Sequence, residues 1–434
     1  VYKLHKFVLR NRGLFVSATA MAAVVILAAI IIALFVFMKN QPLPERGVAP
    51  LVEVAAMEPD SSIWGTNFPN QYSSLLKTYD NNTRTTYGGS EDYSKLEADP
   101  RLVTLFAGYP FSIEYNEERG HLRSLEDVQS IARVNETTHA TCYSCKSSNN
   151  PSLWAEMGME AYDAMLFSEM TPFMENSIGC ANCHEAGTMR LIVTNPALEN
   201  ALEAQGLDWT TFTRQEMRTV VCGNCHVEYY FEGEDKFLVF PWANGTRIEE
   251  IYAYYAEEEF TDWTHPDSGA PLLKAQHPEF EIFTADSTHY AAGVACADCH
   301  MPYTRDGAAK YSNHDVHSPL LNAEAACGTC HTDVTYVTTR VAMIQAQVYA
   351  TLINTEDVIL AAISDIKTAS EATGVDETLL TQAREYHREA QMYWDLIAAE
   401  NSMGFHNPEY VLTSLYHATD VARLAQLTAR QAMP

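Results

Sequence analysis

Basic residues are scarce in this 434-residue chain, which has 28 Lys and Arg against 56 Asp and Glu. The formal net charge at pH 7 is therefore −28. A surface this acidic repels phosphate backbones, so nucleic acid is excluded as a partner. The chain also lacks an internal repeat of constant length, which argues against a solenoid. Its length and its 47% of apolar residues exclude a small scaffold held together by cross-links.

Charged residues are absent from Gly13 to Met38, a run longer than the roughly 20 residues with which a helix crosses a bilayer. Basic residues precede this run, so the positive-inside rule predicts a cytoplasmic stub at 1–13 and a transmembrane signal anchor at 14–38. A cleaved signal peptide is the alternative, although no small-residue cleavage site follows the run. We therefore expect a single-pass protein of the cell membrane, with a proline-marked linker at 39–57 and the remaining chain on the extracytoplasmic face.

Regular periodicity is missing from residue 58 to about residue 337, where short helical patterns alternate with Gly, Pro and Asn. At 338–434 the pattern changes, and apolar residues recur at helical spacing. Three long helices are predicted there, over Thr339–Thr368, Glu377–Asn401 and Glu409–Met433. The sequence thus predicts a mainly α fold with an irregular core and long C-terminal helices.

No cysteine stands alone, because all ten fall in five C-x-x-C pairs, and four of these pairs are followed directly by histidine. Disulfides are permitted in an exported protein, and zinc ribbons also use C-x-x-C pairs, but neither requires a histidine after each pair. C-x-x-C-H is the attachment motif of haem c: the two sulfurs bond the vinyl groups and the histidine ligates the iron. The motifs are Cys180/Cys183 with His184, Cys222/Cys225 with His226, Cys296/Cys299 with His300, and Cys327/Cys330 with His331.

The remaining pair, Cys142 and Cys145, is followed by Lys146. A lysine amine can ligate iron when it is desolvated and deprotonated beside the metal. A disulfide is the alternative for this pair, but the spacing that it shares with four haem motifs favours a fifth haem. Since a haem with two imidazoles only passes electrons, whereas an open position binds a ligand, we expect the chemistry at Lys146. The sequence therefore predicts five covalently bound haems c.

The chain resembles the pentahaem, ammonia-forming cytochrome c nitrite reductases. The resemblance rests on one C-x-x-C-K motif followed by four C-x-x-C-H motifs, within a match from about residue 58 to about residue 408. Further stretches are C-G-N-C-H-V-E-Y-Y-F from Cys222, K-A-Q-H from Lys274, C-A-D-C-H-M-P-Y from Cys296 and G-F-H from Gly404. The resemblance implies a pentahaem catalytic region at 58–337 that reduces nitrite to ammonium with six electrons and eight protons.

By position, the resemblance implies that Arg133, Tyr229 and His277 are the catalytic residues. A guanidinium and an imidazole suit a small anion that must receive protons, and Tyr229 adds a hydroxyl donor. Taken alone, Arg133 would be interpreted as one end of a surface salt bridge.

The resemblance also implies one calcium ion and four distal histidines. The calcium ligands would be Glu228, the main chain of Tyr229, the main chain of Lys274, and Gln276, since oxygen ligands suit this hard cation. His317 stays an alternative to His314 as a distal ligand. The distal ligands would be His314 for the haem of Cys180, His121 for that of Cys222, His406 for that of Cys296 and His289 for that of Cys327. The histidines that match no motif are expected on the surface, and they are His139, His265, His387 and His417.

Members of the family dimerise through long helices, so the region at 338–434 implies a homodimer. A membrane-bound multihaem quinol dehydrogenase is the expected electron donor, because the chain has no second apolar run and no evident quinol pocket. The anchor is a departure from most relatives, which are soluble. The alternative function is a membrane-anchored multihaem electron-transfer cytochrome without its own substrate, which would leave the residues around Lys146 unexplained.

Overall fold

The computed structural model describes residues 21, 25–32, 34 and 50–434, and it divides into two units, Val1–Leu51 and Val52–Pro434. Residues 25–32 of the first unit are helical. Among the described residues, no helix combines the length and the apolar character needed to cross a membrane. The stub at 1–13, most of the anchor at 14–38 and most of the linker at 39–57 lie outside the described residues, so all three stay predictions.

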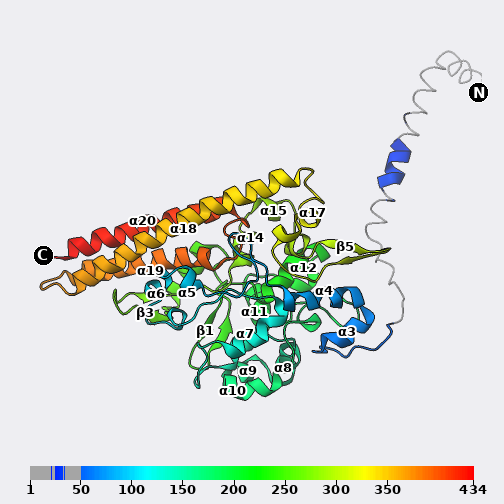
Figure 1. Cartoon of the computed structure of the whole chain (residues 1–434), viewed down its shortest axis with the longest axis horizontal. Coiled ribbons are helices and arrows are strands. Elements are labelled where there is room, and N and C mark those ends of the chain that lie inside the picture. The colour runs from blue at the N-terminus through cyan, green and yellow to red at the C-terminus, as the bar shows by residue number, and fades with distance from the viewer. Residues whose placement is uncertain (1–20, 22–24, 33, 35–49) are drawn as a thin grey trace, which may run out of the picture. The chain divides into compact units, whose positions relative to one another are not determined.

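Three long helices end the chain and pack side by side (Figure 1). The Asp376 side chain caps the second of them by accepting hydrogen bonds from the backbone N–H groups of Thr378 and Leu379. Gly374 has a φ of +83°, a conformation that favours glycine, in the turn before this cap. The helices are α18 (Val334–Ser370), α19 (Glu377–Ala399) and α20 (Pro408–Ala432). The prediction of three long C-terminal helices is confirmed, with α18 beginning earlier than expected.

The rest of the second unit consists mainly of short helices joined by loops, as the irregular pattern predicted (Figure 1). The α-helices are α3 (Ser61–Asn67), α4 (Pro69–Asp80), α5 (Lys95–Ala98), α6 (Arg101–Leu105), α7 (Ser124–Ser130), α8 (Asn150–Met157), α9 (Met159–Ala164), α10 (Phe167–Met170), α11 (Pro196–Ala204), α12 (Arg214–Val220), α13 (Ile248–Glu257), α14 (Glu279–Thr284), α15 (Thr288–Ala291), α16 (Cys296–His300) and α17 (Ala323–Ala326). The 3-10 helices are η1 (Pro110–Ser112), η2 (His121–Arg123), η3 (Ala140–Tyr143), η4 (Thr171–Phe173), η5 (Cys180–Asn182), η6 (Trp209–Thr211), η7 (Val221–Asn224) and η8 (Pro319–Asn322).

Antiparallel two-stranded sheets, which the sequence analysis did not predict, interrupt these helices. They border segments that carry expected site residues: β1 begins directly after Tyr229, β4 leads into Lys274, and β5 follows His300. Strands this short contain too few residues for an alternating pattern to be recognised. The pairs are β1 (Tyr230–Glu232) with β2 (Phe237–Val239), β3 (Trp263–Thr264) with β4 (Pro271–Leu272), and β5 (Tyr303–Asp306) with β6 (Ala309–Ser312).

The largest apolar core joins the long helices to the irregular region. Phe106 and Trp394 are fully buried with ring centroids 6.0 Å apart, and Trp263 and Leu415 belong to the same cluster. This core thus contains residues from both sides of the predicted boundary between 58–337 and 338–434. The boundary itself stays a prediction.

Candidate active site

Eight histidines form four pairs whose ring separations are nearly equal. Two imidazoles that ligate one metal from opposite sides, with bonds of about 2 Å and ring radii of about 1.2 Å, have centres about 6.3 Å apart. The observed separations match this value, so the side chains fit four bis-histidine haems. The ring centroids are 6.3 Å apart in His184–His314, 6.3 Å in His121–His226, 6.2 Å in His300–His406 and 6.4 Å in His289–His331.

Each of these pairs joins a histidine of a C-x-x-C-H motif to the residue predicted as its distal partner. The structure brings His314 opposite His184. His317 is placed differently, because its carbonyl oxygen lies 3.2 Å from Nδ1 of His300 and its own Nδ1 lies 2.6 Å from the Asp315 carbonyl oxygen. His317 therefore orients the axial ring of a neighbouring haem motif, while His314 forms the pair.

Backbone carbonyls hold the Nδ1 atoms of several paired histidines. A hydrogen bond from Nδ1–H fixes the tautomer and leaves Nε2 free to ligate a metal. The Nδ1 atoms concerned are those of His184, 3.1 Å from the Met189 oxygen, His300, 3.2 Å from the His317 oxygen, and His314, 2.8 Å from the Ser312 oxygen.

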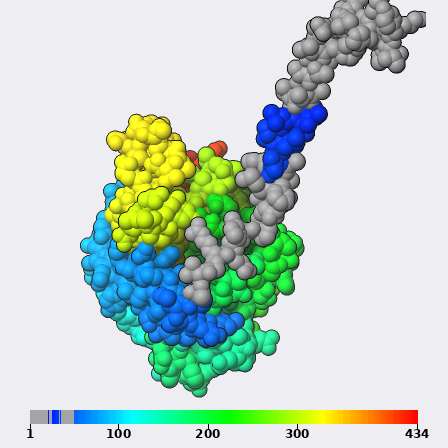
Figure 2. Space-filling view, turned by 90° about the vertical axis from the view of Figure 1, so that its right-hand side faces the viewer, coloured from blue at the N-terminus to red at the C-terminus, as the bar shows by residue number. Residues whose placement is uncertain are grey.

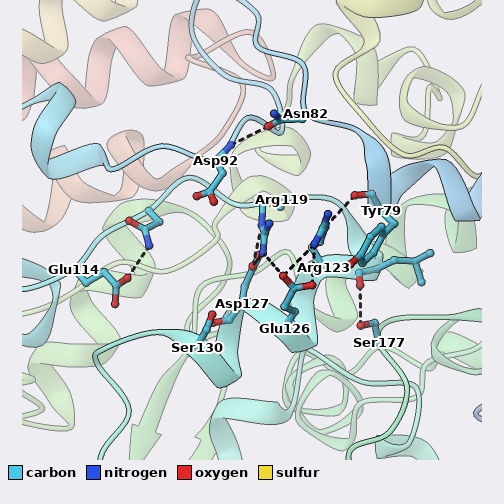
Figure 3. Close-up of polar contacts among 12 residues, drawn as sticks. Tyr79, Asn82, Asp92, Glu114, Arg119, Arg123, Glu126, Asp127, Ser130 and Ser177 are labelled. Carbon is cyan, nitrogen blue, oxygen red and sulfur yellow. Dashed lines mark hydrogen bonds and ion pairs between the residues drawn. The ribbon is translucent and has the colours of Figure 1, made fainter.

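Ion pairs on both sides of His121 fix its position (Figure 3). Arg119 contacts Asp127 and lies 3.3 Å from Glu126, and Arg123 lies 2.9 Å from the same Glu126. Both carboxylates lie on α7, which begins directly after η2. The two arginines therefore tie the segment that carries His121 to the helix that follows it.

Arg133 presents a hydrogen-bond donor without a partner. Its guanidinium carbon lies 3.7 Å from the centroid of the Phe111 ring, and its Nε is buried with no hydrogen-bond acceptor in the described part of the chain. A buried unpaired donor costs about 1–3 kcal/mol, so an anion that accepts from Arg133 would be stabilised here. No ion pair involves Arg133 among the described residues, so the alternative of a surface salt bridge does not describe its arrangement.

The other expected catalytic side chains lie within electrostatic reach of Lys146 and Arg133. Burial lowers the pKa of His277 to about 4, and the Lys146 charge acts in the same direction. Burial raises the pKa of the Cys142 thiol to about 11, against the lowering effects of Arg133 and Lys146. Burial also raises the pKa of Tyr229 well above its ordinary value. His277 is therefore neutral at neutral pH, and Tyr229 keeps its phenolic proton.

The residues expected to hold calcium are brought together around Glu228, which is fully buried. Glu228 accepts hydrogen bonds from the backbone N–H of Gln276 at 2.7 Å and from the Tyr255 hydroxyl at 2.9 Å. The Gln276 amide donates to the Lys274 carbonyl oxygen at 3.1 Å, and Tyr229 follows Glu228 in the chain. Across the described residues, no three His, Cys, Asp or Glu side chains converge in a metal-binding arrangement. A calcium ion would therefore depend on amide and main-chain oxygens beside one carboxylate.

Cysteines of different motifs approach one another. The thiols of Cys145 and Cys225 lie within hydrogen-bonding reach, and so do those of Cys222 and Cys296. Haems attached at these positions would be neighbours. The motifs thus form an order in which electrons can pass from Cys296 through Cys222 to the pair before Lys146.

The prediction that His265 and His387 lie on the surface is wrong, because both are fully buried, with ring centroids 5.6 Å apart. Both accept or donate within the junction between α19 and the β3–β4 hairpin, a contact across the chain that sequence reasoning could not detect. Of the other two unassigned histidines, His417 is exposed, as expected, and His139 is half-buried.

Two carboxylates at axial histidines were missed by sequence reasoning. Glu279 Oε2 lies 3.6 Å from Nδ1 of His226, and Glu400 Oε1 contacts Nδ1 of His406. Although burial acts in the opposite direction, Glu279 raises the pKa of His226 and Glu400 raises that of His406. In the sequence neither glutamate is distinguished from the many others.

Comparison with known proteins follows the same direction. The family model for cytochrome c552 matches residues 60–434. A cytochrome c-552 of Parabacteroides distasonis is 37% identical over 390 residues, which cover 88% of this chain and 78% of that protein. The cytochrome c nitrite reductase subunit NrfA of Nitratidesulfovibrio vulgaris is 38% identical over 414 residues, which cover 86% of this chain and 79% of that protein. The solved cytochrome c nitrite reductase of Desulfovibrio desulfuricans ATCC 27774, whose catalytic subunit is described with two calcium sites, gives a TM-score of 0.81 at 35% identity and covers 88% of both chains.

Covalent-haem motifs and paired histidines in a helical fold define a multihaem cytochrome of the c type. More specifically, the chain belongs to the cytochrome c552 family, to which cytochrome c nitrite reductases belong, and it is an oxidoreductase. The family inferred from the motifs is thereby confirmed, together with a helical fold like that of the solved nitrite reductase.

Proposed function

We propose that this protein reduces nitrite to ammonium, taking up six electrons and eight protons and releasing two water molecules. The observation that carries this proposal is the Nε atom of Arg133, a buried donor without a partner among the described residues, close to Lys146, Tyr229 and His277. A small anion with two oxygen acceptors suits this donor.

A haem c held by Cys142, Cys145 and Lys146 would supply electrons at this place. The protein side chains would bind the anion and move protons. Arg133 donates charge-assisted hydrogen bonds to nitrite oxygens. Neutral His277 can donate from one ring nitrogen and accept at the other, so it can pass protons to the oxygens that leave as water.

The alternative is a membrane-anchored electron-transfer cytochrome without its own substrate. Such a protein has no use for an anion-binding donor beside one haem motif. The unpartnered Arg133 therefore favours the reductase.

The test measures ammonium formed per nitrite consumed by the full-length protein, with a reduced viologen as donor. We expect one ammonium per nitrite from protein that carries five haems by mass spectrometry. Protein with five haems that passes electrons but consumes no nitrite would establish the alternative function.

The proposed cofactors are five haems c and one calcium ion. The cluster of Glu228, Lys274 and Gln276 supports the calcium ion, whose charge would offset the buried carboxylate. We expect Glu228→Gln to lose calcium affinity by about tenfold or more in calorimetric titration. Glu232→Gln, which removes an exposed carboxylate from the same segment, is the matched control and should bind as the unaltered protein does.

The proposed assembly is a homodimer through α18, whose first turns stand out from the surface in Figure 2 (yellow). Tyr336 and Met343 are 68% and 59% exposed and lie about two helical turns apart on this helix. Apolar side chains this exposed are candidates for burial against a second copy. Light scattering in mild detergent should give twice the mass of one chain, and Met343→Glu should reduce it. A monomeric unaltered protein at micromolar concentration would contradict the dimer.

The proposed location is the outer face of the cell membrane, with the anchor at 14–38 retained and a separate multihaem quinol dehydrogenase as electron donor. The apolar run and the basic residues before it support the anchor. An anchored enzyme and a membrane-bound donor would share one plane, which raises their effective concentration. Nitrite reduction by the purified full-length protein with a quinol analogue and no partner would overturn the need for this donor.

A further inference from the structure

The axial histidines differ in what faces their Nδ1 atoms. His184, His300 and His314 face neutral backbone carbonyls, whereas His226 and His406 face the carboxylates of Glu279 and Glu400. Both carboxylates are buried, with 8% and 2% exposure. The Nδ1 atom of His406 and the Oε2 atom of Glu279 are otherwise without hydrogen-bond partners in the described part of the chain. Each carboxylate therefore has one function in this geometry, which is to face an axial imidazole.

A carboxylate and a carbonyl affect a metal-bound imidazole differently. A carboxylate attracts the Nδ1 proton more strongly, which makes the ring a more basic ligand. A more basic ligand stabilises the oxidised iron, and so lowers the reduction potential. Burial strengthens the effect, because a negative charge acts over a longer range at low dielectric constant.

We infer that Glu279 and Glu400 are positioning residues that lower the reduction potentials of the haems attached at Cys222 and Cys296. This inference rests on the proposed function, since it requires the covalent haems. The haem at Cys180 has carbonyls at both of its axial rings and serves as the reference.

The placement of the two carboxylates matches the order of the motifs. Cys296 approaches Cys222, and Cys225 approaches Cys145 of the pair before Lys146. The two haems made most reducing would therefore come directly before the substrate site in the electron path. Electrons held there would pass to the Lys146 haem in the favourable direction.

The segment after α19 adjusts both carboxylates. The Asn401 amide donates to Glu279 Oε1 at 2.7 Å, and the Ser402 hydroxyl donates to Glu400 Oε2 at 2.9 Å. These donors draw negative charge away from the oxygens that face the imidazoles. Removing a donor should therefore strengthen the carboxylate, while removing the carboxylate should abolish its effect.

The experiment is a redox titration of the five-haem protein, followed by electron paramagnetic resonance so that each low-spin haem is observed separately. Glu400→Gln should raise the potential of the Cys296 haem, and Glu279→Gln that of the Cys222 haem. We expect about a tenfold change in the reduction equilibrium, which for one electron is about 59 mV. The Cys180 haem should not move.

Glu356→Gln is the matched control, because it removes a carboxylate of 1% exposure on α18 that pairs with Arg101 and contacts no axial histidine. It should leave all five potentials unchanged. Ser402→Ala and Asn401→Ala keep both carboxylates and should shift the same two haems in the opposite direction, to lower potential. These two variants also decide the matter if the glutamine variants fail to incorporate haem.

Unchanged potentials at the Cys222 and Cys296 haems, or an equal shift at all haems, would overturn the inference. Haem count and ammonium yield are measured on the same samples. A protein that contains five haems and forms ammonium, but shows no selective shift, would contradict only this inference. A protein without five haems or without ammonium formation would contradict the proposed function instead.

Discussion

The C-terminal helices and the region that carries the haem motifs are stabilised in different ways. In the helices, side chains such as Ile359, Leu396 and Leu415 are fully buried against one another. In the motif region, nine of the ten cysteines are only half-buried, Cys330 is exposed, and most elements are a few residues long. The helices can thus be specified by apolar periodicity alone, whereas the motif region requires the groups that its cysteines bind.

Blocking haem attachment should break this comparison most strongly. Without covalent haem, the motif region loses its main packing partners, because short elements bury too little surface to fold alone. We expect limited proteolysis to cut within 58–337 and to spare α18, α19 and α20. Mass spectrometry of the fragments gives the cleavage sites. Uniform cleavage along the chain would show that the helices depend on haem to the same extent.

The sequence predicted the two regions unequally for the same reason. Periodicity defined the long helices, and the C-x-x-C motifs defined the haem sites, because both are local patterns. The four histidine pairs came from a family resemblance, since each joins distant segments. The short hairpins, the burial of His387 and the carboxylates Glu279 and Glu400 were not predicted, because contacts between distant residues create them and no local pattern records them.

The next largest effect is expected where the two regions meet. Asp395 of α19 lies 3.0 Å from Lys274 Nζ and accepts from the Ala275 N–H at 2.9 Å, so it holds the segment that contains the expected calcium ligands. Asp395→Ala should destabilise the protein by about 3–5 kcal/mol, because it leaves the Lys274 charge buried and unpaired. Chemical denaturation measures this loss.

A double variant serves as the control for the ion pair. Lys274→Met with Asp395→Leu removes both charges, and it should regain most of the stability lost by Asp395→Ala. If the double variant is as unstable as the single one, the backbone contact to Ala275 matters more than the charge of Lys274.

Arg133 should affect catalysis and leave stability unchanged, which sharpens the contrast between the regions. Arg133→Ala removes a charged hydrogen bond to the substrate and should lower kcat/KM for nitrite by ~10²-fold or more. Arg423→Ala removes an exposed arginine from α20 and should have no effect. Undiminished turnover of Arg133→Ala with all five haems bound would refute the assignment.

The smallest expected effect is a pH dependence that arises within the helices. His387 lies on α19 with Nε2 2.9 Å from Gln391 Oε1 and Nδ1 3.0 Å from Ser268 Oγ, and the Gln391 amide nitrogen donates to the Leu105 carbonyl. The amide oxygen is thereby fixed toward the imidazole, so His387 is neutral, donating from Nε2 and accepting at Nδ1. Burial, with a smaller contribution from His265, lowers its pKa from 6.5 to about 3.

Between pH 6.5 and about pH 3, the unfolded chain binds a proton at residue 387 that the folded chain does not bind. Stability should therefore fall as the pH falls through this window, with a slope from this group of at most about 1.4 kcal/mol per pH unit. His387→Gln should be less stable at pH 7 but should lose less stability between pH 7 and pH 5 than the unaltered protein. His417→Gln changes an exposed histidine of α20 and should keep the full pH dependence. An equal pH dependence in all three proteins, measured from urea midpoints, would show that His387 takes up its proton without unfolding.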